Sequence, residues 1–361
     1  MNLSQIKIVN LQRSSQVSIN MAMQQIIAMA IETNASDIHI PPLEDMQANI
    51  KFRIDGIITK IKTINTANYN KLIIHLKVLA NLDITCHNLP QDGRFSMPCK
   101  DGNIDCRINF CPCIYGQNIV IRILINKIEL TLAELGMLPQ QEAAILKKIK
   151  QKHGLVLVAG PTGSGKTITL YSMLKILSQQ NLNIITVCDP VEVMLTGISQ
   201  TNVSSQLGYR EILTTFLRQD PDVIMIGEIR DYETLKIAIQ AASTGHLVLS
   251  SIHADNANGT LSRLKHMGAN LSEINTNIEL IIAQRLIRKL CKNCHGGDDN
   301  CLSCNKGYKG QQGVFEMIQA PIKVMENKLV GSYTMLDAAK RLLAKTITDI
   351  KELQRVFAKE C

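Results

Sequence analysis

The sequence contains no tryptophan, and aromatic residues make up only 4% of its 361 residues. Aliphatic side chains must therefore fill the hydrophobic cores. No stretch approaches the roughly 18 consecutive apolar residues that a transmembrane helix requires. The first residues also lack the basic segment and apolar core of a signal peptide. Together these absences favour a cytoplasmic protein and argue against a secreted or membrane-spanning one.

The cysteines do not suggest disulfides, because their number, 11, is odd and no secretion signal accompanies them. Four of them form two Cys-x-x-Cys pairs, Cys291 with Cys294 and Cys301 with Cys304. Four thiolates at this spacing are typical of a structural Zn²⁺ site with no open coordination position. Four reduced, metal-free thiols are the alternative. A redox pair is disfavoured, because no thioredoxin-like strand and helix surround the motif.

Charge is modest and dispersed. The formal net charge is +8, and the lysines and arginines are spread along the chain rather than gathered in one segment. This balance favours an anionic partner, such as a nucleotide, an acidic protein face or membrane lipid. Direct nucleic-acid binding is not expected, because the clustered basic footprint of such proteins is missing.

The first half of the chain, residues 1–125, has the pattern of a mixed α/β domain. Apolar residues at helical spacing predict helices, and alternation of apolar and polar residues predicts strands. The predicted helices span 19–31 and 69–82, and the predicted strands span 49–54, 104–110 and 119–124. Residues 126–140, ending near a proline, are interpreted as an inter-domain linker.

Residues 141–290 have the pattern of a doubly wound α/β domain. Short, continuous apolar runs suit parallel strands that are covered on both faces, and they occur at 155–159, 184–187, 223–226 and 247–252. An apolar stripe at helical spacing predicts a long helix over 271–290. Residues 291–361 are expected to form a helical C-terminal region that carries the cysteine pairs.

A phosphate-binding loop follows the first of these strands. Its sequence, Gly160-Pro161-Thr162-Gly163-Ser164-Gly165-Lys166-Thr167, fits the G-x-x-x-x-G-K-[ST] pattern and precedes a helix-competent segment. The glycines allow the backbone N–H groups to point at phosphates. Lys166 would reach the β- and γ-phosphates, and the Thr167 hydroxyl would bind Mg²⁺. The loop therefore predicts ATP or another nucleoside triphosphate together with Mg²⁺.

A second nucleotide motif lies further along the chain. The apolar run 223–226 ends in Gly227-Glu228, and such an acid at the end of a strand is the expected Mg²⁺- or water-handling partner of a phosphate loop. Alone this signal would be weak, since apolar strands often end in Glu. After a phosphate loop it is strong.

Several segments closely resemble the ATPases of type II secretion and type IV pilus assembly (the GspE/PilB family). Residues 216–222 (FLRQDPD) and 227–231 (GEIRD) resemble its Walker B region, 245–254 (GHLVLSSIHA) its His box and 185–192 (ITVCDPVE) its Asp box. Residues 36–40 (SDIHI), 53–56 (RIDG) and 91–94 (QDGR) resemble its second N-terminal domain. The resemblance runs from about residue 25 to the C-terminus.

The resemblance implies a fold and a set of roles. The fold would be an α/β, RecA-like P-loop ATPase core with a smaller N-terminal α/β domain. Two arginines of the N-terminal domain would reach the phosphates bound by a neighbouring subunit. The implied roles are a general base for Glu192, Mg²⁺ and water binding for Glu228, γ-phosphate sensing for His253, nucleotide contact for Arg218, and charge neutralisation in the neighbour's site for Arg94 and Arg107.

Three positions depart from the family pattern. Cys188 replaces the first Glu of the usual Glu-Asp-Pro, Thr214 replaces a common Arg, and Gln117 replaces a usual Glu. Cys188 and Thr214 leave room for a different class of protein, a nucleotide-binding scaffold with little hydrolysis. The paired cysteines resemble an element of the assembly members, generally with a longer insert between the pairs. Retraction members generally lack it.

The resemblance implies a homo-hexameric motor that hydrolyses ATP to assemble a type IV pilus, a competence pseudopilus or a type II secretion pseudopilus. Such a motor acts on pilin-like subunits through an inner-membrane platform protein, at the cytoplasmic face of the membrane. A retraction ATPase or a conjugation-type secretion ATPase is the nearest alternative. The chain begins close to the second N-terminal domain, and its length resembles that of competence-type members without the first.

Overall fold

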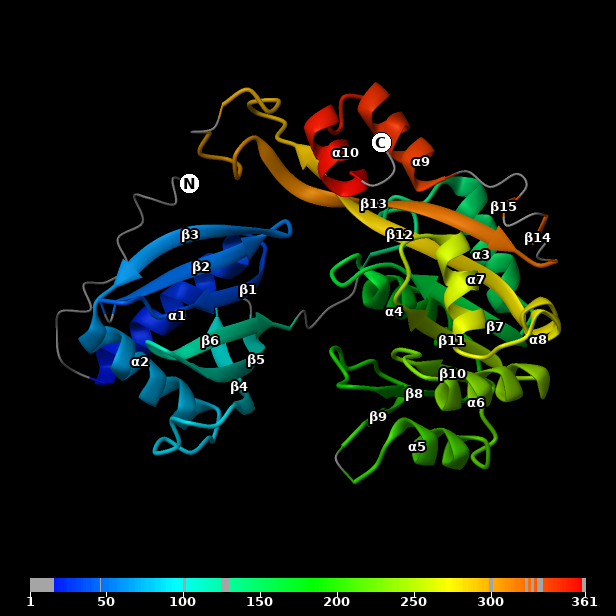
Figure 1. Cartoon of the computed structure of the whole chain (residues 1–361), viewed down its shortest axis with the longest axis horizontal. Helices are drawn as coiled ribbons and strands as arrows, with labels where there is room; N and C mark the ends of the chain where they lie inside the picture. Colours follow the sequence, from blue (N-terminus) through cyan, green and yellow to red (C-terminus); the bar gives the residue numbers. More distant parts are fainter. Residues whose placement is uncertain are drawn as a thin grey trace. The chain divides into compact units, whose positions relative to one another are not determined.

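The computed structural model divides the chain into two compact units (Figure 1). Unit 1 comprises Met1–Asn126 and Leu290–Gly310, and unit 2 comprises Lys127–Lys289 and Gln311–Cys361. None of the described helices is long and apolar enough to cross a membrane. The structure describes residues 16–45, 47–99, 102–124, 130–204, 206–298, 301–321, 324–325, 328–329 and 334–358.

Unit 1 is built on a six-stranded sheet in the order β3-β2-β1-β6-β5-β4, in which neighbouring strands are antiparallel. The helices α1 (Gln16–Glu32) and α2 (Thr66–Leu79) pack with it. The strands are β1 (Ala35–Ile40), β2 (Ala48–Ile54), β3 (Ile57–Ile64), β4 (Gln91–Cys99), β5 (Gly102–Cys113) and β6 (Gly116–Ile123).

One face of this sheet carries the core. Side chains at alternate positions, such as Ile38, Phe52 and Ile108, are buried with Ile27 of α1 and Leu76 of α2. Because successive side chains of a strand point to opposite faces, the residues between them lie on the other face. The predicted helices and strands of this half are confirmed. β1, β3 and β4 were not predicted, because their apolar residues are diluted by polar ones.

Unit 2 is built on a seven-stranded sheet in the order β13-β12-β7-β11-β10-β8-β9, which is parallel from β12 to β9. A short strand pair lies apart from it. The strands are β7 (Gly154–Ala159), β8 (Ile184–Cys188), β9 (Ser199–Asn202), β10 (Val223–Ile226), β11 (Leu247–Ile252), β12 (Ile278–Leu290), β13 (Tyr308–Gln319), β14 (Val324–Met325) and β15 (Lys328–Leu329).

Helices cover both faces of the parallel sheet. Leu155 and Leu157 of β7 belong to a core shared with α5, α6 and α7, whereas Val156 and Val158 belong to a core shared with α3 and α4. The prediction of strands buried on both faces is confirmed. The helices are α3 (Pro139–Lys150), α4 (Lys166–Leu177), α5 (Tyr209–Phe216), α6 (Tyr232–Ser243), α7 (Ala257–His266), α8 (Leu271–Asn277), α9 (Met335–Ala344) and α10 (Ile350–Phe357).

The prediction of one long helix over 271–290 is wrong. The helix α8 ends at Asn277, and β12 follows directly and pairs in parallel with β7. Leu280 and Ile282 enter one core while Ile281 and Ala283 enter the other. A strand that is buried on both faces has apolar residues at nearly every position, and such a run also satisfies helical spacing.

The expected helical C-terminal region also differs from the structure. The helices α9 and α10 are present, but the strand β13 precedes them, and the cysteine segment groups with unit 1. Two hydrogen bonds attach this segment to the β2–β3 hairpin. The Gly310 N–H donates to Asp55 Oδ2 at 2.9 Å, and Asn305 Nδ2 donates to Thr59 Oγ1 at 3.0 Å.

Candidate nucleotide and metal sites

Four predicted motifs meet at one edge of the parallel sheet of unit 2. The phosphate loop follows β7, the Asp box runs from β8 into the loop after it, Glu228 follows β10 and His253 follows β11. These strands are neighbours in the order β7-β11-β10-β8. Since the carboxyl ends of parallel strands lie at the same edge, the topology gathers these segments where α/β proteins bind ligands.

The phosphate loop has the backbone that a bound phosphate requires. Gly163 and Gly165 have φ of +78° and +87°, in the left-handed region that favours glycine, and α4 begins at Lys166. A Cβ on Gly160 would collide with the hydroxyl of Ser164. That hydroxyl is buried and has no hydrogen-bond partner among the described residues. The tight loop and the helix N-terminus fit a nucleotide phosphate.

Lys166 lies over its own loop. Its Nζ donates to the carbonyl oxygens of Gly160, at 2.8 Å, and Pro161, at 3.1 Å. Burial lowers the pKa of Lys166, while the negative charge of Glu228 acts in the opposite direction. Thr167 is the second residue of α4 and is partly exposed. The charged amine and the hydroxyl thus stand at the start of the same helix.

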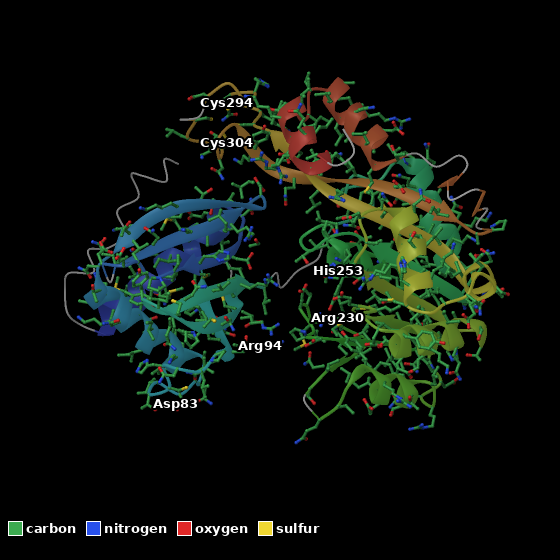
Figure 2. All side chains as sticks on the ribbon, viewed as in Figure 1. Asp83, Arg94, Arg230, His253, Cys294 and Cys304 are labelled. Carbon is green, nitrogen blue, oxygen red and sulfur yellow. The ribbon has the colours of Figure 1, made fainter. Side chains whose placement is uncertain are left out.

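Glu228 is held by two basic side chains, and Figure 2 labels both of them. His253 Nε2 lies 3.0 Å from Glu228 Oε1, and Arg230 Nε lies 3.0 Å from Oε2. Arg230 also reaches Asp189 Oδ2 at 3.7 Å. Asp189 and Arg230 were not among the predicted site residues, although both lie inside the motifs that carried the resemblance. The cluster fixes the orientation of a carboxylate that is only 16% exposed.

The pKa of His253 is lowered, first by burial and next by the positive charge of Lys166, against the opposing effect of Glu228. The ring is therefore neutral near pH 7. A neutral ring that donates to Glu228 from Nε2 carries its single proton there, which leaves Nδ1 as an acceptor.

Two predicted residues stand apart from this cluster. Glu192 is exposed beyond β8, where the preceding Val191 N–H donates to Asn202 Oδ1 at 2.7 Å. Arg218 is exposed just after α5. In the part of the chain that the structure describes, neither side chain joins the ion pairs of Glu228.

Arginines form a row across the sheet of unit 1. Arg94 of β4 pairs in register with Arg107 of β5, which pairs with Arg122 of β6. Asp37 continues the row on β1 and forms ion pairs with Arg122, at 2.9 Å, and with Arg53, at 3.5 Å. Figure 2 labels Arg94 in this unit. The structure thus brings both predicted arginines together and adds Arg122, which the sequence pattern had not singled out.

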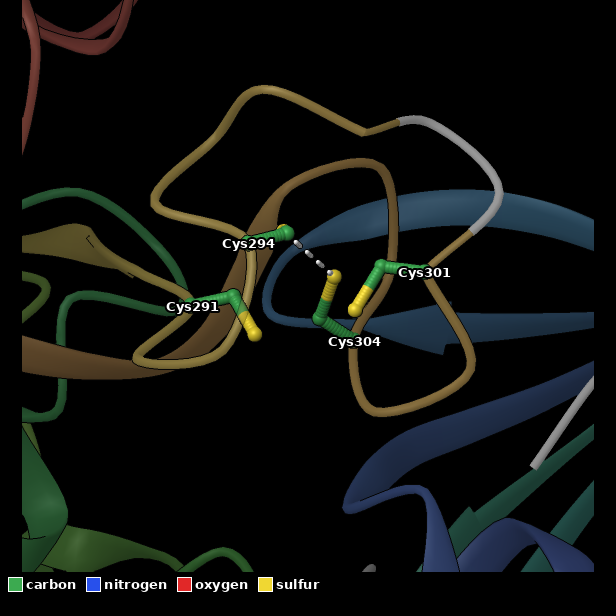
Figure 3. A group of neighbouring side chains, drawn as sticks. All are labelled: Cys291, Cys294, Cys301 and Cys304. Carbon is green, nitrogen blue, oxygen red and sulfur yellow. Dashed lines mark hydrogen bonds between the residues drawn. The ribbon is translucent and has the colours of Figure 1, made fainter.

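The four predicted metal ligands converge in one cluster (Figure 3). The sulfur atoms of Cys291, Cys294, Cys301 and Cys304 all lie within 4.8 Å of one another. The Sγ atoms of Cys294 and Cys304 are 3.7 Å apart. Thiolates at the corners of a tetrahedral zinc site, with Zn–S bonds of about 2.3 Å, are separated by roughly 3.8 Å. The donor set and its spacing therefore fit Zn²⁺.

The backbone of the first cysteine pair favours a thiolate. N–H groups of Cys294 and Asn293 point at Cys291 Sγ and lower the pKa of Cys291 to about 7. The two cysteine loops approach each other closely. A Cβ on Gly307, which has a φ of +83°, would lie 2.9 Å from Gly296 Cα. The Cys291 N–H donates to Gly307 O at 2.8 Å. A metal binds the thiolate form, so this environment supports the metal site.

The parallel sheet, the phosphate loop and the acid at the end of β10 define a P-loop nucleotide-binding protein with a RecA-like core. The family model described as type II/IV secretion system protein matches residues 12–357. The chain belongs to this family, which confirms the resemblance seen in the sequence.

Named relatives extend this result. The chain is 43% identical, over 342 residues, to a protein transport protein HofB homolog of Haemophilus influenzae, covering 93% of this chain and 73% of that one. It is 41% identical to the type IV pilus assembly ATPase PilB of Pseudomonas aeruginosa, covering 80% of this chain and 56% of PilB.

Solved structures agree with the fold. The pilus retraction motor PilT with bound ADP matches with a TM-score of 0.66 and 27% identity, covering 92% of this chain and 96% of that one. The ATPase DotB of Legionella pneumophila matches with a TM-score of 0.74, covering 93% of this chain and 95% of DotB. At 21% identity this second match speaks for the fold alone.

Proposed function

We propose that this chain is an ATP-hydrolysing motor subunit that drives assembly of a type IV pilus, a competence pseudopilus or a type II secretion pseudopilus. One observation carries the proposal: the phosphate loop, Glu228 and His253 stand at the same edge of one parallel sheet. Family membership and the assembly and transport names of relatives near 40% identity support the role.

The side chains of unit 2 divide the chemistry of hydrolysis. Lys166 and the loop N–H groups bind the phosphates, and the Thr167 hydroxyl and Glu228 hold Mg²⁺, which neutralises phosphate charge. Glu192 acts as the general base that orients the attacking water. Arg230 and His253 keep the Glu228 carboxylate in one orientation. His253 senses the γ-phosphate, and Arg218 contributes a further charge near the nucleotide.

The active site is completed by a neighbouring subunit of a homo-hexameric ring. Arg94 and Arg107 stand side by side, and no carboxylate lies within salt-bridge distance of either among the described residues. Like charges in register repel each other, so the row gains stability when it meets an anion. A neighbour's γ-phosphate is such an anion, and its charge spreads in the transition state.

The remaining partners follow from the family role. The motor acts at the cytoplasmic face of the cell membrane on an inner-membrane platform protein, and through it on pilin-like subunits. Zn²⁺ in the four-cysteine cluster is structural and holds the β12–β13 connection in shape. A retraction or conjugation-type motor is less favoured, because relatives near 40% identity have assembly and transport names, whereas PilT is 27% identical.

Phosphate release from purified, oligomeric, zinc-replete protein tests the activity. The wild type should release phosphate at least about 100-fold faster than Lys166→Ala or Glu192→Gln. Wild-type release no faster than that of the variants would instead favour the nucleotide-binding scaffold, for which Cys188 and Thr214 leave room.

Mixing of variants tests the shared site. Lys166→Ala lacks the loop lysine, and Arg107→Ala lacks only the arginine given to the neighbour. Each alone should be nearly inactive, while an equal mixture should recover roughly a quarter of wild-type activity, since sites with both intact halves form at subunit boundaries. Lys51→Ala, on the same face of the sheet, is the matched control. No recovery on mixing would contradict the shared site.

A further inference from the structure

Gln284 lies beside the phosphate loop on β12, in unit 2. The last residue pair of the β12–β7 ladder is Ala283 with Ala159, so Gln284 stands next to Gly160. It is only 1% exposed. A buried side-chain amide requires partners for both of its ends, because an unpaired polar group in the interior is costly.

Both ends of the amide are bound, and both partners belong to the loop and its helix. Nε2 donates to the carbonyl oxygen of Ser164 at 2.5 Å, and Oε1 accepts from Thr169 Oγ1 at 2.8 Å. Ser164 is inside the loop, and Thr169 is in the first turn of α4. Gln284 therefore ties the loop to the helix that follows it.

The contact with Ser164 has a directional consequence. The carbonyl of Ser164 and the N–H of Gly165 belong to one planar, trans peptide unit, so they point in opposite directions. Holding the carbonyl toward β12 turns the Gly165 N–H away from β12. Backbone N–H groups of such loops are the groups that bind phosphate.

We propose that Gln284 is a positioning residue for nucleotide phosphates, acting through the Ser164–Gly165 peptide plane. The proposal rests on nucleotide binding at the loop, which is part of the proposed function. Only a side chain with a donor at one end and an acceptor at the other satisfies both partners. Glutamate would present an acceptor to the Ser164 carbonyl, and methionine would bind neither partner.

Gln284→Met and Gln284→Glu are compared with the wild type in binding a fluorescent ADP analogue and in steady-state ATP hydrolysis. Both should raise the Kd for the ADP analogue and the KM for ATP about tenfold, the effect of one hydrogen bond. Saturating ATP should recover most of kcat. Ser172→Ala, one turn along α4 and hydrogen-bonded to Leu130 and Ile168 instead, is the matched control.

A merely structural role predicts a different result. A smaller fraction of the protein would be active, so the apparent kcat would fall while the Kd for the ADP analogue stayed unchanged. That result, or a Kd within twofold of wild type for both variants, would overturn the proposal. If neither variant folds, Thr169→Val tests the same tie from its other end and should raise the Kd in the same direction. Binding is measured separately from hydrolysis, so an inactive wild type would refute the motor but leave this test intact.

Discussion

The two units place functional residues in different ways. In unit 1, the antiparallel sheet leaves one face free of the core, and charged residues line up across its strands, as Arg94 and Arg107 do. In unit 2, the parallel sheet is covered on both faces, so polar groups concentrate at the ends of its strands, as Glu228 and His253 do. A sheet covered on one face can place functional residues on its open face, whereas a sheet covered on both faces can place them only at its edge.

The difference explains how much each side chain is constrained. Glu228, at the edge of unit 2, is largely buried and held from two sides. Arg94, on the open face of unit 1, is exposed. Groups at the edge are therefore pre-oriented, and groups on the face remain available to another molecule. Five predictions test this contrast.

The largest effect is expected at the edge of unit 2. Glu228→Gln keeps the shape of the side chain but removes its charge, so ATP hydrolysis should fall about 1000-fold, or about 4 kcal/mol in transition-state stabilisation. Binding of a fluorescent ADP analogue should stay within about twofold of wild type. Glu233→Gln, on the exposed side of α6, serves as the control. Hydrolysis within tenfold of wild type would contradict the role of Glu228.

The next effect concerns stability of unit 2. Glu352 of α10 is fully buried and forms ion pairs with Arg288 of β12 at 2.7 Å and with Arg355 at 2.6 Å. Glu352→Gln removes the buried negative charge that Arg288 and Arg355 face and should cost about 3 kcal/mol in urea unfolding. An unchanged urea midpoint for unit 2 would show that the two ion pairs of Glu352 do not stabilise the fold.

The same residue predicts a pH dependence. Burial raises the pKa of Glu352, but hydrogen bonds from Arg355 and Arg288 outweigh burial and leave the pKa lower than usual. A lowered pKa in the folded state stabilises the fold above the unfolded value, about 4.3, and the gain is lost as the pH falls through the folded value. The difference between wild type and Glu352→Gln should therefore shrink below about pH 4.

Metal removal should affect unit 1 more than unit 2. Replacing Cys291 and Cys304 with serine, or adding a zinc-selective chelator with Mg²⁺ kept in excess, should lower the melting temperature of unit 1 by about 5 °C or more. Hydrogen exchange should increase in the β2–β3 hairpin and stay unchanged in β7. Cys113→Ser, at an exposed position of β5, is the control. Equal loss of protection in both units would contradict the assignment of the cysteine segment to unit 1.

The smallest effect is expected for the stability of unit 1, after a substitution on the open face of its sheet. Arg107 stands between two arginines in register, so Arg107→Gln should stabilise unit 1 by about 0.3 kcal/mol at low salt. The gain should vanish at about 1 M salt, where screening removes the repulsion. The change in unfolding free energy is measured by denaturant titration at both salt concentrations. Lys51→Gln serves as the comparison. Destabilisation at low salt would show that the row is already compensated within the chain.

The sequence predicted the edge of unit 2 better than the face of unit 1, for a physical reason. A strand followed by its loop is continuous in the chain, so the phosphate loop and Glu228 could be read directly. The arginine row depends on the register of β4, β5 and β6, which no single segment contains. Its third member, Arg122, therefore became visible only in the structure.

The sequence analysis missed the roles of two other residues, Gln284 and Arg230, because these roles also depend on contacts between strands. Gln284 contacts Ser164 across 120 residues of sequence, and the helix predicted over 271–290 concealed the strand that makes this contact possible. Likewise, Arg230 lies in a motif that carried the family resemblance. It connects Glu228 with Asp189, however, and these two residues follow different, neighbouring strands. Contacts between strands decide these roles, and periodicity along one segment does not report them.

The path of the chain between the units limits how the protein can be dissected. It leaves unit 2 after Lys289, passes through the four-cysteine segment in unit 1 and returns at Gln311. A single cut after Asn126 would release a fragment that still carries the cysteines but has lost Asp55 and Thr59, the residues that hold them. An autonomous nucleotide-binding fragment requires two changes, removal of unit 1 and a short designed turn that joins Lys289 to Gln311.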